Sequence, residues 1–165
     1  MRAAGAVNLH GGVWVLPHRP EQEAVARSVF TEIRAAGGDL ILIAGDTLAG
    51  LDAETVRERF QAERDQEYAE FCERCHEFMA EVDRETAKRK FTFAELEEIE
   101  DDLGKLQAWL GKIQRRDFFG ATRARQAVEE IAACEQACAA FTGRVYAEQG
   151  VNVADGEIYP PGEPG

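Results

Sequence analysis

Apolar residues recur every three or four positions after about residue 65, and this spacing constrains the fold more than any other feature. The clearest run comprises Leu96, Ile99, Leu103, Leu106, Leu110 and Ile113. The flanking runs comprise Tyr68, Phe71, Cys75, Phe78 and Val82, and then Ala127, Ile131, Cys134, Cys138, Phe141 and Val145. Such spacing gives each helix one apolar stripe, and short connections make neighbouring helices antiparallel. Residues 51–150 are therefore predicted to form an antiparallel three-helix bundle.

Local signals set the limits of these helices. Asp52 is a good cap for the first helix, which should run to about Lys88. Thr92 and Glu95 match a capping box that begins the second helix. The last helix should fade near Gly150, and residues 151–165, with prolines among glycines, are predicted to form a disordered tail.

Residues 1–50 have a different pattern and are predicted to form a small separate unit. Two short β-type runs flank a glycine pair at 11–12, which predicts a hairpin. Pro20 should begin a helix that ends at the glycine pair 37–38. The apolar run 39–44 predicts a strand that is covered on both faces. The resulting order, β-β-α-β, is half of a ferredoxin-like sandwich, so the predicted class is α+β.

Composition and charge exclude several classes of protein. The longest apolar run, 40–44, is far too short to span a membrane, and Met1 is not followed by a signal peptide, so a cytoplasmic protein is expected. The net charge is −12, of which −9 falls on residues 51–105. An acidic surface repels phosphate backbones, so any contact with nucleic acid must be local.

One basic cluster interrupts this acidity, at the predicted turn between the second and third bundle helices. The candidate anion-binding or DNA-binding residues are Arg64, Arg115, Arg116, Arg123 and Arg125. Guanidinium groups suit phosphate and small oxyanions. Equally, Arg115 and Arg116 could stabilise the helix end through its dipole. The helical register places Arg64 on the inward face, where Asp117 is its expected partner.

The four cysteines lie within the apolar stripes or beside them, and the register puts Cys75 and Cys134 in one layer. Together with His76 they could hold zinc, but Cys72 and Cys75 lie mid-helix rather than on a turn. The favoured interpretation is that these cysteines are small core residues. Cys72, Cys75, Cys134 and Cys138 stay weak candidates for a metal site, and a redox-sensitive pair of Cys75 and Cys134 is a further alternative.

No sequence signature of an enzyme is found. A Gly-rich phosphate loop, a nucleophile elbow, a His-Glu-x-x-His motif and the two Glu-x-x-His motifs of a di-iron bundle are all lacking. The abundant carboxylates at 95–102 match a solvated helix face. A non-enzymatic protein without a cofactor is therefore expected.

Several short motifs, taken in order, resemble the N-terminal domain of the chromate-resistance protein ChrB. They are Gly12-Val13-Trp14-Val15-Leu16-Pro17, Arg64-Asp65-Gln66-Glu67-Tyr68, Lys90-Phe91-Thr92-Phe93-Ala94-Glu95-Leu96-Glu97-Glu98, Trp109 and Arg116-Asp117-Phe118-Phe119-Gly120. The resemblance implies a bacterial regulator of transcription in the chromate stress response, with operator DNA and chromate or another oxyanion as partners. The alternatives are a helical protein-interaction scaffold without a ligand, or a cysteine-based metal or redox sensor.

Members of that family generally begin with a further strand and helix, whereas this sequence enters at Arg2-Ala3-Ala4-Gly5, which looks like the end of that helix. Two interpretations stay open: a stand-alone half, or a start that is set too far downstream. Without that opening strand, the apolar strand 39–44 has no neighbour in its own sheet. An unpaired strand edge invites pairing with a second copy, so a homodimer is also expected.

Overall fold

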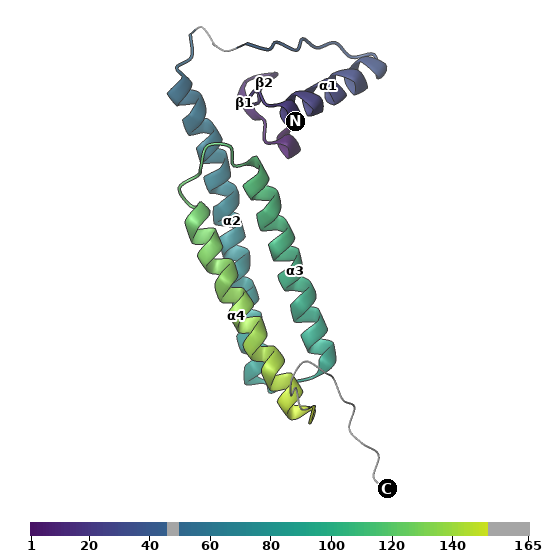
Figure 1. Ribbon diagram of the computed structural model, residues 1–165, viewed down its shortest axis with the longest axis vertical. Helices are drawn as coiled ribbons and strands as arrows, with labels where there is room; N and C mark the ends of the chain where they lie inside the picture. The colour runs from purple at the N-terminus through teal and green to yellow at the C-terminus, as the bar shows by residue number, and fades with distance from the viewer. Residues whose placement is uncertain (46–49, 152–165) are drawn as a thin grey trace. The chain divides into compact units, whose positions relative to one another are not determined.

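The computed structural model of the protein describes residues 1–45 and 50–151. Its elements are η1 (Arg2–Ala4), β1 (Val7–His10), β2 (Val13–Val15), α1 (Pro20–Ala35), α2 (Ala53–Ala87), α3 (Phe93–Arg116) and α4 (Ala124–Glu148) (Figure 1). A two-stranded antiparallel sheet is followed by helices, which confirms the predicted α+β class.

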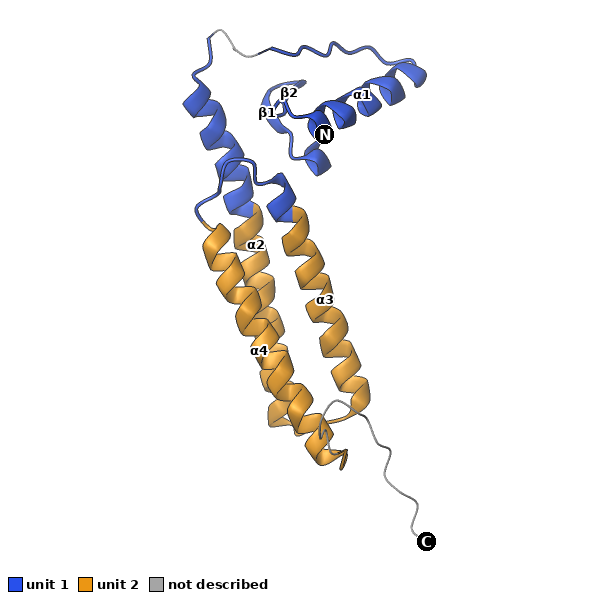
Figure 2. Ribbon diagram, viewed as in Figure 1, with its two compact units in different colours: residues 1–66, 113–122 blue, residues 67–112, 123–165 orange. Residues whose placement is uncertain are grey.

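The chain divides into two compact units (Figure 2). Unit 1 comprises residues 1–66 and 113–122, and unit 2 comprises residues 67–112 and 123–165. The predicted segments were 1–50 and 51–150, whereas α2 and α3 each contribute residues to both units. The predicted disordered tail falls on residues 152–165, which lie outside the described part of the chain.

The predicted hairpin is present in unit 1. Val7 pairs with Val15, and Asn8 pairs with Trp14. Gly11 turns the chain with a φ of 54°, a conformation that glycine adopts without strain. The Asn8 side-chain amide donates to the Gly11 carbonyl at 2.8 Å and closes the turn.

The segment after α1 corrects one prediction. The helix begins at Pro20 and ends at the glycine pair, as expected, and the Gly38 amide donates to the Ile33 carbonyl at 2.9 Å. Residues 39–44, however, do not form the predicted strand, and Ile41 and Ile43 are each 84% exposed. A strand needs a hydrogen-bonded neighbour, and in the described part of the chain β1 and β2 pair only with each other. Apolar composition alone does not supply that neighbour.

In unit 2, α2, α3 and α4 run side by side (Figure 1). The Phe71 and Trp109 rings join α2 to α3 edge to face, with centroids 5.6 Å apart. The Cys134 thiol of α4 donates to the Cys75 carbonyl of α2 at 3.7 Å, so these two cysteines share a layer, as the register predicted. The stripe predicted for the last helix is buried at every position: Ala127, Ile131, Cys134, Cys138, Phe141 and Val145.

The start of α3 matches one half of the predicted capping box. The Glu95 amide donates to the Thr92 hydroxyl oxygen at 3.2 Å. The Glu95 carboxylate instead lies 3.0 Å from the Lys90 ammonium. Within residues 1–45 and 50–151, none of the helices has the length and apolar character that crossing a membrane requires.

Candidate functional site

Three phenylalanines form the centre of the candidate site in unit 1. Phe60 of α2 is 3% exposed, and its ring centroid lies 6.1 Å from that of Phe118 and 5.2 Å from that of Phe119. Phe118 and Phe119 belong to the loop that joins α3 and α4. Phe119 is 37% exposed, so this aromatic group reaches the surface.

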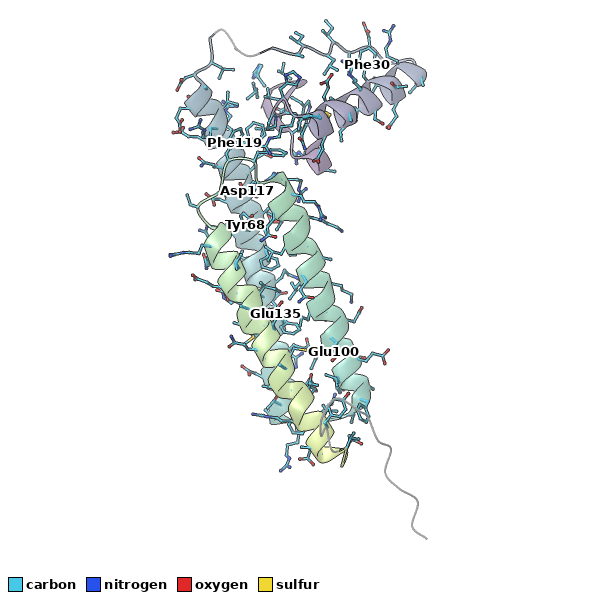
Figure 3. The ribbon with its side chains drawn as sticks, in the orientation of Figure 1. Phe30, Tyr68, Glu100, Asp117, Phe119 and Glu135 are labelled. Carbon is cyan, nitrogen blue, oxygen red and sulfur yellow. The ribbon has the colours of Figure 1, made fainter. Side chains whose placement is uncertain are left out.

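Hydrogen bonds to α2 and within the loop fix the position of these two rings. The Gln61 side-chain amide donates to the Phe119 carbonyl at 3.2 Å, and the Thr122 hydroxyl donates to the Asp65 carboxylate at 2.8 Å. Both carboxylate oxygens of Asp117 accept from the Ala121 amide at 3.0 Å. Asp117 and Phe119 are labelled in Figure 3. The loop therefore presents its rings in one conformation.

Arginines from three segments surround the rings. The Arg19 guanidinium lies 5.3 Å from the Phe118 ring centroid, and that of Arg57 lies 5.9 Å from the Phe119 centroid. Arg116, the last residue of α3, adjoins Gly5 beside Phe118. We call this group the arginine–phenylalanine cluster; its members are Arg19, Arg57, Arg116, Phe60, Phe118 and Phe119.

The hairpin is held against the same cluster. Gly5 has a φ of 82°, and a β-carbon at this position would lie 2.8 Å from the Phe118 ring, too close for any other residue. The Arg59 guanidinium donates to the Leu9 carbonyl at 2.8 Å and so ties β1 to α2. The cluster is thus built from segments that are far apart in the sequence.

The arginines at this cluster differ in whether a carboxylate neutralises their charge. Arg57 forms an ion pair with Glu54 at 2.9 Å. Arg19 forms an ion pair with no carboxylate in the described residues, and the same holds for the exposed Arg115 beside the cluster. Unit 1 carries 9 basic and 11 acidic side chains, whereas unit 2 carries 10 and 20. Unit 1 therefore repels an anion much less than unit 2 does.

The five arginines predicted from the sequence fall in both units. Arg115 and Arg116 end α3 in unit 1, and Arg64 in the same unit is only 4% exposed, which confirms its inward orientation. Its neighbour Glu63 lies 3.4 Å away. Arg123 and Arg125 belong to unit 2, at the start of α4. The pairing of Arg64 with Asp117 stays a prediction.

A comparison with protein families decides what kind of chain this is. A family model described as "Protein ChrB, N-terminal" matches residues 1–152. The chain belongs to this family. It is therefore a domain of a chromate-resistance protein, as its motifs suggested. Neither a curated protein nor a solved structure matches the chain.

Sequence reasoning missed two arginines of the cluster in this ChrB N-terminal chain. Arg19 and Arg57 lie far from the basic turn in sequence, and no spacing rule connects them to Phe118 or Phe119. The motif Arg116-Asp117-Phe118-Phe119-Gly120, which contributed to the resemblance, begins the loop between α3 and α4. This loop carries the two rings that Arg19 and Arg57 contact.

The cysteines of this ChrB N-terminal chain are all buried, as the core interpretation predicts. Burial raises the pKa of each thiol, and for Cys75 the neighbouring Cys134 raises it further. Among the described residues, no group of three or more His, Cys, Asp or Glu side chains could hold a metal ion. His76 lies 3.2 Å from Glu130 on the surface of unit 2.

An open depression of about 360 Å³ lies at the other end of α2, within unit 2. Its two arginines are engaged with other side chains. Arg89 forms an ion pair with Glu148 at 2.7 Å, and the Arg144 guanidinium lies 5.9 Å from the Phe91 ring centroid. Because unit 2 is strongly acidic and Glu148 lines this depression, an anion would be bound less favourably here than at the cluster.

Proposed function

We propose that the chain is a non-enzymatic regulatory module of chromate resistance that binds DNA through the arginine–phenylalanine cluster. The observation that carries this proposal is the set of arginines held over aromatic rings at the surface of unit 1. Arg19 and Arg57 supply two of these contacts, and Arg115 adds an exposed charge beside them. The regulatory part of the proposal rests on the resemblance of the motifs to chromate-resistance regulators.

The chemistry of the cluster suits a phosphate backbone. A guanidinium group offers several N–H donors in one plane and keeps its charge at any physiological pH. An aromatic ring beneath it limits its motion, so less conformational entropy is lost when a phosphate binds. Phosphate contacts of this kind position a protein on DNA without reading its sequence.

The charge distribution supports unit 1 as the DNA-contacting part. Unit 2, with twice as many acidic as basic side chains, is repelled by a phosphate backbone. We therefore expect a small contact area with few neutralised phosphates. The affinity should depend on salt less steeply than that of strongly basic DNA-binding proteins.

The same cluster provides a route by which chromate could release DNA. Chromate is a doubly charged tetrahedral oxyanion, and its oxygens are arranged much like those of a phosphate group. Guanidinium groups that accept one of these anions also accept the other. We therefore infer that chromate competes with the DNA backbone for the arginines of the cluster.

The test is binding to the DNA upstream of the protein's own gene, measured by fluorescence anisotropy near physiological salt, with and without chromate. The informative variant is the pair Arg19→Ala and Arg115→Ala. Arg27→Ala and Arg74→Ala form the matched control, because both side chains are exposed and each pairs with a glutamate of its own helix. Sulfate serves as the control oxyanion.

We expect the variant pair to lower affinity at least tenfold. The slope of log affinity against log salt should also become shallower, by about 0.9 for each phosphate that the variant no longer neutralises. The control pair should bind as the unchanged protein does. If the two double variants bind this DNA with equal affinity, the cluster is excluded as the DNA-binding site. An absence of DNA binding in every condition would favour the interaction scaffold instead.

A further inference from the structure

The stretch from residue 20 to residue 45 contains no buried residue, although it is rich in apolar side chains. These side chains are Val25, Val29, Phe30, Ile33, Leu40, Ile41, Leu42 and Ile43. Single exposed apolar residues are ordinary, but contiguous apolar surface usually marks a site of association. The apolar side chains of this stretch are therefore expected to be buried by a partner, because the described residues do not bury them.

The exposure of the last part of this stretch alternates as it does in a strand. Ile41 and Ile43 are each 84% exposed, whereas Leu42 between them is 42% exposed. The two isoleucines consequently belong to one face, since alternate residues of an extended chain point to opposite sides. Within the described residues, the backbone groups of 39–45 form no hydrogen bonds with other backbone groups. Both the isoleucine face and the backbone are available for pairing.

The entry to this segment is well fixed. Gly37 has a φ of 80°, and the Gly38 amide bonds to the Ile33 carbonyl, so α1 ends in a defined reversal of the chain. The Asp39 carboxylate then lies 2.8 Å from the Arg34 guanidinium. The charge that precedes the apolar residues is thereby neutralised within the chain.

We propose that residues 40–44 pair with the same segment of a second copy of this chain as antiparallel strands. The sequence supports a second copy as the partner, because residues 39–45 are complementary to the same residues in antiparallel orientation. In the register that centres the two-fold axis on Leu42, Ile41 lies opposite Ile43 of the second copy. All four isoleucines then share one face, and Asp39 lies opposite the second copy's Gly45 rather than another carboxylate.

Neighbouring registers are less favourable. Centring the axis on Ile41 would place Asp39 opposite Ile43 of the second copy and shorten the apolar pairing. An odd shift would bring side chains from opposite faces into register, which a two-fold axis perpendicular to the sheet does not allow. The isologous arrangement is closed, so it gives a dimer rather than a filament.

The expected dimer is weak, because a five-residue strand pair buries less area than a stable interface of about 800 Å² per partner. We would measure the mass of the full chain by light scattering over a wide range of protein concentration. The mass should rise from 18.3 kDa toward twice that value as the concentration increases. A mass that stays at 18.3 kDa at every concentration would overturn the proposal.

The decisive variant is the pair Ile41→Lys and Ile43→Lys, whose side chains are too exposed for folding to depend on them. This pair should abolish the rise in mass, whereas Val128→Lys, a matched change at a 47% exposed valine of α4, should not. Far-ultraviolet circular dichroism confirms that each variant is folded. A dimer that survives the isoleucine changes would assign the interface to another surface and overturn the proposal.

The register has a test of its own. A cysteine introduced by Leu42→Cys would face its own copy across the axis, so a short bifunctional maleimide should cross-link it under native conditions. The unchanged chain, whose cysteines are all buried, is the control. If the Leu42→Cys protein is dimeric by mass but does not cross-link, this register is excluded. The proposal does not rest on DNA binding, because light scattering reports pairing whether or not the cluster binds DNA.

Discussion

Glu85, near the end of α2, shows how a charged side chain is accommodated in the interior of unit 2. It is 4% exposed, but Lys88 lies 2.8 Å from one of its carboxylate oxygens and Lys90 lies 3.2 Å from the other. The hydrogen bond from Lys88, with the ion pair to Lys90, lowers the pKa of Glu85 to about 2 from an ordinary value of 4.5. The folded state therefore favours the ionised form of this carboxylate.

We expect Glu85→Gln to lower the melting temperature at neutral pH. Above pH 4.5 the carboxylate is ionised in both states, and its stabilising contribution is complete. As the pH falls from 4.5 toward about 2, the unfolded state takes up a proton that the folded state does not, so this contribution is lost. The difference in melting temperature between the two proteins, followed by circular dichroism, should shrink over this interval.

Glu97→Gln is the matched control for this experiment, because Glu97 is exposed on α3 and has no ion pair among the described residues. Its melting temperature should follow that of the unchanged protein at every pH. A Glu85→Gln deficit that stays constant between pH 6 and pH 2.5 would show that the ion pairs with the lysines are not responsible.

At the scale of the element, the start of α3 depends on one hydroxyl group. Replacing Thr92 by alanine removes the acceptor for the Glu95 amide and should destabilise the protein by about 1 kcal/mol, within a usual range of roughly 0.5–2 kcal/mol. Urea unfolding measures this loss. Thr92→Ser keeps the hydroxyl and should stay close to the unchanged protein; equal losses in both variants would point to the threonine methyl group instead.

The helices could be predicted because their signals are local. The stripe from Ala127 to Val145 and the cap at Thr92 each depend on residues within a few turns of one another. The strand expected at 39–44 failed for the opposite reason, since a strand forms only with a partner strand, and none of the described segments near it supplies one. Arg19 and Arg57 of the cluster escaped prediction in the same way, because they meet Phe118 and Phe119 only through the tertiary fold.

At the scale of the whole molecule, burial is distributed unevenly along the chain. α4 buries six residues along its length, whereas α1 buries none. Local opening should therefore cost much less free energy in α1 than in α4. We expect the backbone amides of α1 to exchange with deuterium far faster than those around Cys134 and Cys138.

Hydrogen–deuterium exchange followed by mass spectrometry tests this expectation on the intact chain at low concentration. Peptides from β1 and β2 provide a comparison within unit 1, because Val7 is only 1% exposed. They should exchange more slowly than α1. Equal protection of α1 and α4 would mean that the apolar side of α1 is covered in solution.

The contact of Gly5 with Phe118 also has a consequence for the order of events during synthesis. Unit 1 is completed by residues 113–122, so its first 66 residues are synthesised before Phe118, the neighbour of Gly5, exists. At about 5–20 residues per second, the intervening segment takes roughly 2–9 s to translate. During that interval the second part of α2 and most of α3 are made, while Gly5 still lacks its contact with Phe118. The N-terminal segment is therefore synthesised first, but it packs against Phe118 only after most of the chain has been made.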